Sequence, residues 1–362
     1  PFGARKLIGV AVGVGPPPAD LSPKSIRALS RVVDEIPALT PEFISLARWV
    51  ADYYLTPLGE VLSAMLPRAA SLRRRMRFVL TDAGRQAQAE AGQMLVASAE
   101  QSLLQRIAKR GGLNRETLRG AADLVETLRR RGWLALEESV EDSVAREVPD
   151  ESAQPSGLFS NSNGTRWELT QPQQTALERI TDQMDSGQFG VLLLHGVTGS
   201  GKTEVYMRAI EVALARGHRA LMLVPEINLT PAMAGQFAAR FGERIAVLHS
   251  GLDDRERERV WQRVRDGSPG NRVDVLIGTR SAVFAPLASP ALIIVDEEHD
   301  ASYKQEEAPR YHGRDVAIVR AREIGATVVL GSATPSVETR HHAESGKYQL
   351  LELEGRVQER PL

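Results

Sequence analysis

With 362 residues, the chain is long enough for two or three domains, and no stretch of it is long and apolar enough to span a bilayer. Hydrophobic residues make up 42% and charged residues 25%, fractions that are typical of soluble globular proteins and exclude wholesale disorder and a fibrous class. Because the 45 basic and 46 acidic side chains nearly cancel, any contact with nucleic acid must come from local patches, and the absence of cysteine excludes disulfides and thiol nucleophiles and fits a reducing cytoplasm.

The start of the chain predicts a small unit that contains β-structure and two helices. Residues 6–14 are β-branched and interrupted by glycine, which favours a strand, and three prolines at 16–18 end it. Helical spacing follows at 24–33 and 41–54. The chain begins without methionine, so we interpret Pro1 as a cut end and expect this unit to begin upstream.

A basic run and a helical segment come next. Residues 71–77 read Ser-Leu-Arg-Arg-Arg-Met-Arg, which fits a phosphate contact and a solvated linker equally well. Three helix-like stretches then precede a strand at 132–136 that would open a hairpin; they are residues 101–109, 115–121 and 124–131. This order is typical of a winged helix, although many small helical bundles would give the same pattern.

The second half of the chain predicts a doubly wound α/β domain with a parallel sheet. Residues 149–164 are polar and rich in turn formers, which indicates a linker and a domain boundary. Beyond it, strands and helices alternate, and continuous apolar runs such as 191–194 indicate strands covered on both faces. The expected strands are residues 190–195, 219–224, 245–249, 273–277, 292–295 and 327–330, and the expected helices are residues 203–216, 230–241, 253–266 and 314–324.

A phosphate-binding loop follows the first of these strands. Residues 196–203 read Gly-Val-Thr-Gly-Ser-Gly-Lys-Thr, a full match to the pattern in its required place between a strand and a helix. Backbone N–H groups of such a loop curl around phosphates, and the helix that starts at Lys202 offers its positive end. We expect Lys202 to reach the β- and γ-phosphates and Thr203 to bind Mg²⁺; an ordinary glycine-rich turn is the alternative. The candidate ATP-binding residues are Gly196, Val197, Thr198, Gly199, Ser200, Gly201, Lys202 and Thr203.

Acidic residues end another buried strand. The sequence Asp-Glu-Glu-His at 296–299 places carboxylates at the carboxyl edge of the sheet, where open α/β sheets bind ligands. Phosphoryl transfer to water needs a carboxylate beside Mg²⁺ and a group that orients the water. We assign Asp296 to the metal through a water and Glu297 to the attacking water; the alternative is that both acids cap the following helix. For His299 we expect a neutral role that links the acids to a neighbouring loop, with a plain surface histidine as the alternative.

Hydroxyl groups close a third strand at the same edge. Residues 330–335 read Leu-Gly-Ser-Ala-Thr-Pro, which places Ser332 and Thr334 where they can report the state of the γ-phosphate. The glycine loop, Asp-Glu-Glu-His and Ser-Ala-Thr, in that order, resemble motifs I, II and III of superfamily 2 helicases.

Further segments resemble the PriA family of bacterial replication-restart helicases, and together they cover essentially the whole chain. These segments are residues 1–3, 51–54, 57–61, 169–173, 223–231, 248–252, 277–284, 302–305 and 310–315. The resemblance implies the remainder of a 3′-DNA-binding domain at 1–70, a linker and winged-helix domain at 71–148, a linker at 149–164 and a RecA-like, ATP-binding helicase lobe at 165–362.

The resemblance also implies contacts with the base of ATP and with DNA. Gln173 would contact adenine. Residues 303–315 would form an aromatic-rich loop that couples DNA to the ATP site, in which aromatic faces stack on bases and cations attract phosphates. Without the resemblance, this stretch would fit a charged surface loop equally well. The implied DNA-binding residues are Gly3, Arg27, Arg280, Tyr303, Lys304, Arg310, Tyr311 and Arg314.

As a function, the resemblance implies a cytoplasmic motor that uses ATP with Mg²⁺ and moves 3′ to 5′ on DNA at stalled or abandoned forks. Its partners would be forked DNA with the 3′ end of the leading strand, primosome proteins and single-strand binding protein. The family also has a second lobe with an arginine finger and a zinc module with eight cysteines, which we expect beyond Leu362. On this interpretation the chain binds ATP but hydrolyses it poorly. Ala232 stands where the family usually has glutamine, so we expect one contact there to be lost.

Two other functions stay open. One is a nucleotide-responsive module that binds DNA and recruits partners without turnover, and the other is a different superfamily 2 translocase. A P-loop kinase fits poorly, because Asp-Glu-Glu-His and Ser-Ala-Thr are not features of an acceptor-substrate pocket.

Overall fold

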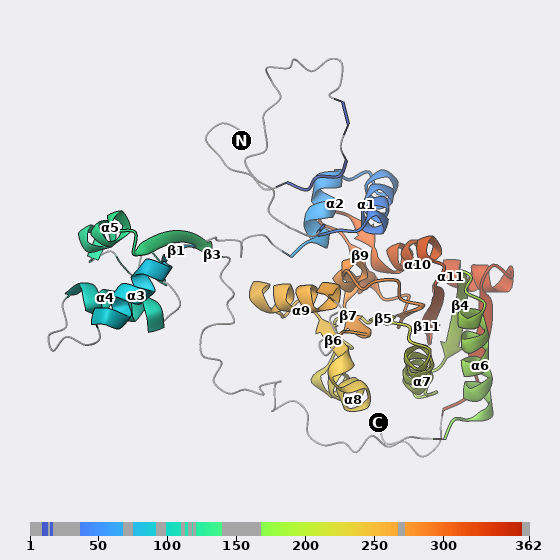
Figure 1. Cartoon of the computed structure of the whole chain (residues 1–362). Coiled ribbons are helices and arrows are strands. Elements are labelled where there is room, and N and C mark those ends of the chain that lie inside the picture. Colours follow the sequence, from blue (N-terminus) through green and yellow to red (C-terminus); the bar gives the residue numbers. More distant parts are fainter. Residues whose placement is uncertain are drawn as a thin grey trace. The chain divides into compact units, whose positions relative to one another are not determined.

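The computed structural model describes residues 9–13, 15–16, 37–67, 75–91, 99–109, 113–114, 118, 121–139, 168–266 and 272–356. The chain forms two compact units: residues 1–69 group with 155–362, and residues 70–154 form the other (Figure 1). The predicted helix at 24–33 and the linker at 149–164 lie outside the described residues, and residues 9–13 of the predicted first strand belong to no strand. No helix among the described residues has the length and apolar character needed to cross a membrane.

The smaller unit combines an antiparallel sheet of three strands, in the order β2-β1-β3, with three helices. The strand β3 pairs with β1 from Leu80↔Leu134 to Arg75↔Ser139. The strand at 134–139 thus pairs with a strand that precedes the helices, whereas the residues that would complete the predicted hairpin lie outside the described residues, so the hairpin stays a prediction. The winged-helix assignment stays a prediction. The elements are β1 (Arg75–Leu80), α3 (Asp82–Ala91), α4 (Ala99–Lys109), β2 (Leu113–Asn114), α5 (Ala122–Arg130) and β3 (Leu134–Ser139).

The larger unit contains a parallel sheet of seven strands in the order β12-β4-β11-β8-β5-β7-β6. This confirms the predicted α/β lobe. The edge strand β12 was not expected, since polar residues interrupt its apolar run. The strands are β4 (Gly190–Gly196), β5 (Ala220–Leu223), β6 (Ile245–Leu248), β7 (Val275–Gly278), β8 (Leu292–Val295), β11 (Thr327–Ser332) and β12 (Gln349–Leu353).

Helices cover both faces of this sheet, and each face has its own core, because successive strand residues point to opposite sides. Leu192 and Leu194 of β4 pack with α6, α7 and α8, whereas Val191 and Leu193 belong to the core that includes residues of α9, α10 and α11 (Figure 1). The helices are α6 (Gln171–Asp185), α7 (Lys202–Ala215), α8 (Pro231–Phe241), α9 (Asp254–Asp266), α10 (Gly313–Ile324) and α11 (Val337–Glu344).

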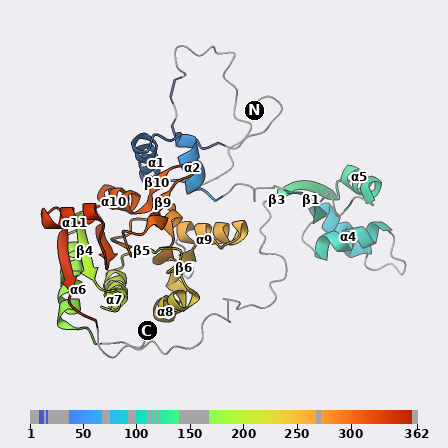
Figure 2. The ribbon, with the colours of Figure 1, turned by 180° about the vertical axis from the view of Figure 1, so that it is seen from behind.

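Two helices from the start of the chain pack against the same lobe. They are α1 (Pro41–Tyr53), which lies beside α10 in the two opposite views, and α2 (Leu58–Met65), which lies nearer α9 (Figures 1 and 2). The Phe43 ring lies 4.7 Å from the guanidinium carbon of the buried Arg320. The Trp261 indole N–H donates to the Met65 carbonyl at 3.3 Å. These contacts join α1 and α2 to the core of the lobe.

Short elements lie before and after β8, between β7 and α10. They are the 3₁₀ helices η6 (Arg280–Phe284) and η7 (Ala301–Tyr303) and the two-stranded antiparallel ribbon of β9 (Lys304–Gln305) and β10 (Tyr311–His312); a third 3₁₀ helix, η5 (Gly242–Arg244), follows α8.

Candidate nucleotide-binding site

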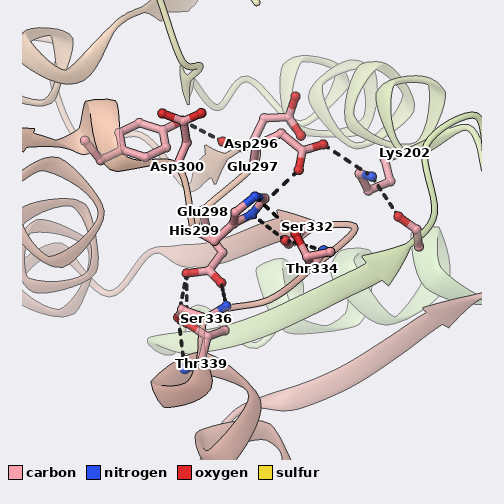
Figure 3. A network of polar contacts seen from close by, with 12 residues as sticks. Lys202, Asp296, Glu297, Glu298, His299, Asp300, Ser332, Thr334, Ser336 and Thr339 are labelled. Carbon is pink, nitrogen blue, oxygen red and sulfur yellow. Dashed lines mark hydrogen bonds and ion pairs between the residues drawn. The ribbon is translucent and has the colours of Figure 1, made fainter.

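Three loops that carry the predicted motifs meet at one edge of the sheet. They follow β4, β11 and β8, which are adjacent strands, and the parallel register pairs Leu330 with both Leu193 and Val295. The loops after these strands therefore begin side by side. Figure 3 shows the polar side chains of all three converging on one network. This edge is where parallel sheets bind ligands.

The glycine loop forms a tight turn into α7. Gly199 and Gly201 have φ angles of 84° and 85°, in the left-handed region that favours glycine. Gly196 cannot carry a side chain, because a Cβ there would lie 2.5 Å from Ser200 Oγ and 2.9 Å from Leu353 Cβ. Val197, Thr198 and Gly199 are exposed. The turn is thus an open cradle at the start of a 14-residue helix, the arrangement that a phosphate requires.

Lys202 links this loop to the acidic motif. Its side chain is buried, and Nζ donates to the Gly196 carbonyl at 2.8 Å. The same Nζ lies 3.5 Å from Glu297 Oε1. One cation therefore lies between the phosphate loop and the carboxylate that follows β8 (Figure 3). Thr203 is half-buried in the first turn of the same helix.

Asp296 is held by two buried tyrosines. The Tyr206 hydroxyl donates to Asp296 Oδ1 at 3.0 Å, and the Tyr303 hydroxyl donates to the Asp296 carbonyl at 2.6 Å. Burial, together with the charge of Glu297, raises the pKa of Asp296 to about 6. A Cβ at residue 331 would overlap the Tyr206 hydroxyl, so Gly331 makes this contact possible. Asp296 is thus fixed in orientation and ionised above about pH 6.

The sequence reasoning missed Tyr206. Its position four residues after Lys202 puts both side chains on one side of α7, one helical turn apart, and this spacing is the signal that was available. Burial and the neighbouring Asp296 raise the pKa of Tyr206 well above its ordinary value, so its hydroxyl keeps the proton that it donates.

His299 connects the acidic motif to the hydroxyl motif. Its Nδ1 lies 2.8 Å from Ser332 Oγ and 3.8 Å from Glu297 Oε2, and its Nε2 lies 3.1 Å from Thr334 Oγ1. Glu297 itself has a φ of 43°, which is strained for a residue with a Cβ. The turn after β8 thus presents Glu297 between Lys202 and His299 (Figure 3).

Glu298 is fully buried and carries a network that the sequence did not indicate. Its Oε2 accepts from Arg314 at 2.7 Å and from the Thr339 hydroxyl at 2.9 Å, and its Oε1 accepts from the Ser336 backbone N–H at 2.7 Å. Arg314 lies in the first turn of α10, and Ser336 precedes α11. The carboxylate therefore ties both helix starts to the acidic motif.

Gln173 is buried next to the phosphate loop and binds its backbone. It is fully buried, its Oε1 accepts from the Thr170 N–H at 3.0 Å, and its Nε2 donates to the Ser200 carbonyl at 2.8 Å. Both ends of the amide thus bind the protein backbone in this structure, and the implied contact with adenine stays a prediction.

The implied DNA-binding residues comprise two that the structure does not describe, two tyrosines and four cations. Gly3 and Arg27 lie outside the described residues. Tyr303 and Tyr311 are buried in the core in this structure, and the expected stacking of their rings on bases stays a prediction.

The four described cations among the implied DNA-binding residues differ in whether other groups of the protein already bind them. Arg280 donates to the carbonyls of Ser302 and Lys304 at 2.8 and 2.7 Å, and Arg314 pairs with Glu298, so both are occupied within the protein. Lys304 and Arg310 are exposed, although Lys304 lies 3.3 Å from a carboxylate oxygen of Glu306 and Arg310 Nε donates to the Glu306 carbonyl at 3.2 Å. These two remain open to a phosphate.

The residues at this edge fit a magnesium nucleotide. The open cradle with a neighbouring lysine suits phosphates, and the Asp296 carboxylate is an oxygen ligand of the kind that Mg²⁺ prefers, directly or through water. No group of three or more His, Cys, Asp or Glu side chains among the described residues could hold a metal ion by itself. The implied zinc module therefore stays a prediction about sequence outside this chain.

Comparisons with known proteins agree with these observations. Residues 170–342 match the model of the DEAD/DEAH box helicase family, and residues 1–67 match the 3′DNA-binding domain (3′BD) of PriA. The replication restart protein PriA of Bacillus subtilis is 33% identical over 99% of this chain and 52% of its own length. The corresponding protein of Haemophilus influenzae is 36% identical over 99% of this chain and 48% of its own length. The chain spans about half the length of the curated relatives that it matches.

Proposed function

This chain belongs to the PriA family of replication restart proteins, and we propose that it is the ATP-binding and DNA-binding part of an ATP-dependent 3′-to-5′ DNA helicase. The whole protein recognises stalled or abandoned replication forks in the cytoplasm and starts primosome assembly there. Primosome proteins and single-strand binding protein are its proposed partners.

The observation that carries this proposal is the meeting of three motifs around one cation. Lys202 lies between the phosphate loop and Glu297, at 2.8 Å from the Gly196 carbonyl and 3.5 Å from Glu297 Oε1. A lysine, a glycine cradle and a carboxylate so placed are the parts that nucleotide hydrolysis by P-loop proteins uses.

Each residue then has a distinct task. When bound, Mg²⁺-ATP supplies the γ-phosphoryl group and a divalent charge. Lys202 would neutralise phosphate charge, and Thr203 and Asp296 would hold the metal, Asp296 through a water. Glu297 orients the attacking water and accepts its proton. Through its contacts with Glu297, Ser332 and Thr334, His299 transmits the state of the γ-phosphate to the loop after β11.

Turnover by this chain alone is proposed to be slow. An arginine finger contributes roughly 10³–10⁵ in turnover to related phosphoryl-transfer proteins. The motif residues of the site are one lysine, two carboxylates, one histidine and hydroxyl groups, with no arginine among them, so binding is proposed to exceed hydrolysis.

The test is nucleotide binding by the 362-residue chain. Wild-type chain and Lys202→Ala are titrated with Mg²⁺-ATP in a calorimeter, with Lys347→Ala as the control, because Lys347 is an exposed lysine whose recorded contacts are with His342 and the Tyr348 ring. We expect Lys202→Ala to lose ATP affinity by at least tenfold and the control to keep it. Equal affinity of all three proteins, or no binding by the wild type, would refute the proposal.

DNA contact is proposed at the ribbon that precedes α10. Lys304 and Arg310 are exposed there, and the binding of cations to phosphates depends on salt. The double substitution Lys304→Ala/Arg310→Ala is expected to weaken binding of fluorescent forked DNA and to lower the salt dependence of its affinity. An unchanged salt slope would assign DNA binding to other residues.

A further inference from the structure

The edge strand β12 brings a segment of the chain to the phosphate loop. It runs parallel to β4, and its register pairs Leu351 with Leu194 and Leu353 with Gly196. Gly196 is also the first residue of the phosphate loop, so the residues after Leu353 and the residues after Gly196 leave the sheet side by side. A Cβ at Gly196 would lie 2.9 Å from Leu353 Cβ, which shows how closely the two strand ends approach.

Arg356 lies against the middle of this loop. Gly355 has a φ of 74°, which turns the chain after β12. A Cβ built on Gly199 would lie 3.9 Å from Arg356 Cγ and 4.0 Å from Arg356 Cδ. The Arg356 side chain is exposed, and no hydrogen bond or ion pair is recorded for it with another described residue. An unpaired guanidinium is thus carried to an exposed, glycine-lined cradle.

We propose that Arg356 is a nucleotide-binding residue that donates to oxygens of the β- or γ-phosphate of the triphosphate held by residues 196–203. This inference rests on the proposed function and extends it with a residue that no motif contains. Guanidinium groups suit phosphates because their N–H donors form a planar fork that matches two oxygens at once.

The position of Arg356 favours phosphate over the base. A Cβ built on Gly199 would lie at ordinary contact distance from two methylene groups of Arg356, and Gly199 lies inside the loop that curls around phosphates, between the strand and the start of α7.

The experiment measures the affinity of the 362-residue chain for Mg²⁺-ATP, ADP and AMP by calorimetry. The variants are Arg356→Ala, Arg356→Lys and, as a matched control, Arg340→Ala. Arg340 is a cation of α11 whose Nε binds Glu344 Oε1 at 2.7 Å. Thermal melting of each variant checks that the fold is kept.

We expect Arg356→Ala to weaken ATP binding by about tenfold, the effect of one partly exposed charged hydrogen bond, and to leave AMP binding unchanged. Arg356→Lys keeps part of the affinity because it retains the charge without the fork, and Arg340→Ala binds ATP as the wild type does. Wild-type ATP affinity in Arg356→Ala overturns the inference, as does an equal loss for ATP and AMP, which would assign the contact to the base, the sugar or the α-phosphate that both nucleotides share. Failure of the wild type to bind ATP refutes the proposed function itself.

Discussion

Replacing Asp296 by asparagine is expected to stabilise the fold while it removes the proposed metal contact. Asp296 is 8% exposed, and its pKa is raised from 3.8 to about 6 by burial and by the charge of Glu297. The folded protein therefore holds the neutral acid more favourably than the charged one. Asparagine has nearly the same shape, still accepts from the Tyr206 hydroxyl and never ionises.

The magnitude follows from the pKa. A rise of roughly two units, at about 1.4 kcal/mol for each, corresponds to about 3 kcal/mol of folding free energy. Because the folded pKa lies above the unfolded one, this stability is fully present below about pH 4 and is lost as the pH rises through 6. The asparagine NH₂ group has to find a hydrogen-bond acceptor that the carboxylate did not need, which reduces the gain. We therefore expect the free energy of unfolding of Asp296→Asn to exceed that of the wild type by about 1–3 kcal/mol at pH 8 and by almost nothing at pH 4.

The assay is urea unfolding of both proteins from pH 4 to pH 8 in EDTA, which keeps metal ions from shifting the result. Taking the difference between the two stability profiles removes the contribution of every other titrating group. A difference that does not change with pH would refute the assigned pKa. A variant less stable than the wild type at pH 8 would show that the carboxylate is favourably placed even without a metal.

Two further predictions concern the tyrosines. Gly331→Ala is expected to destabilise the fold by about 2–4 kcal/mol in urea unfolding, since its methyl group overlaps the Tyr206 hydroxyl, and the double variant with Tyr206→Phe should recover part of the loss. Burial raises the pKa of Tyr311 to about 12, so the unfolded chain ionises first and stability is lost as the pH rises from 10 through 12. Tyr311→Phe should flatten the stability profile in that range by up to about 3 kcal/mol, and parallel profiles for the two proteins would contradict this.

The parallel sheet could be predicted because its central strands are almost entirely apolar in sequence. Strands β4 and β8 are covered on both sides, so their sequences are continuous apolar runs. The strand β1 was missed for the opposite reason: arginines at 75 and 77 alternate with apolar residues in a short sheet, and the segment read as a basic linker. The composition of residues 75–80 gives no information about the strand with which they pair.

The motifs located the candidate site, but the tertiary contacts decided which side chains face it. Tyr303 lies in a polar stretch but is buried, and its hydroxyl donates to the Asp296 carbonyl, seven residues earlier in the chain. The Gln173 amide donates to the Ser200 carbonyl of the phosphate loop, 27 residues away. Neither partner can be predicted from sequence spacing, and the ligand contacts expected for both residues came from the family resemblance.

The two helices that begin at Gly313 and Val337 share one enclosed carboxylate, that of Glu298. Moving α10 away would take Arg314 from the buried Glu298 and leave its charge without a counter-ion, a change that costs several kcal/mol. Moving α11 away would take the Ser336 N–H and the Thr339 hydroxyl from the same carboxylate and leave two of its hydrogen bonds unmade. We therefore expect the starts of α10 and α11 to move together.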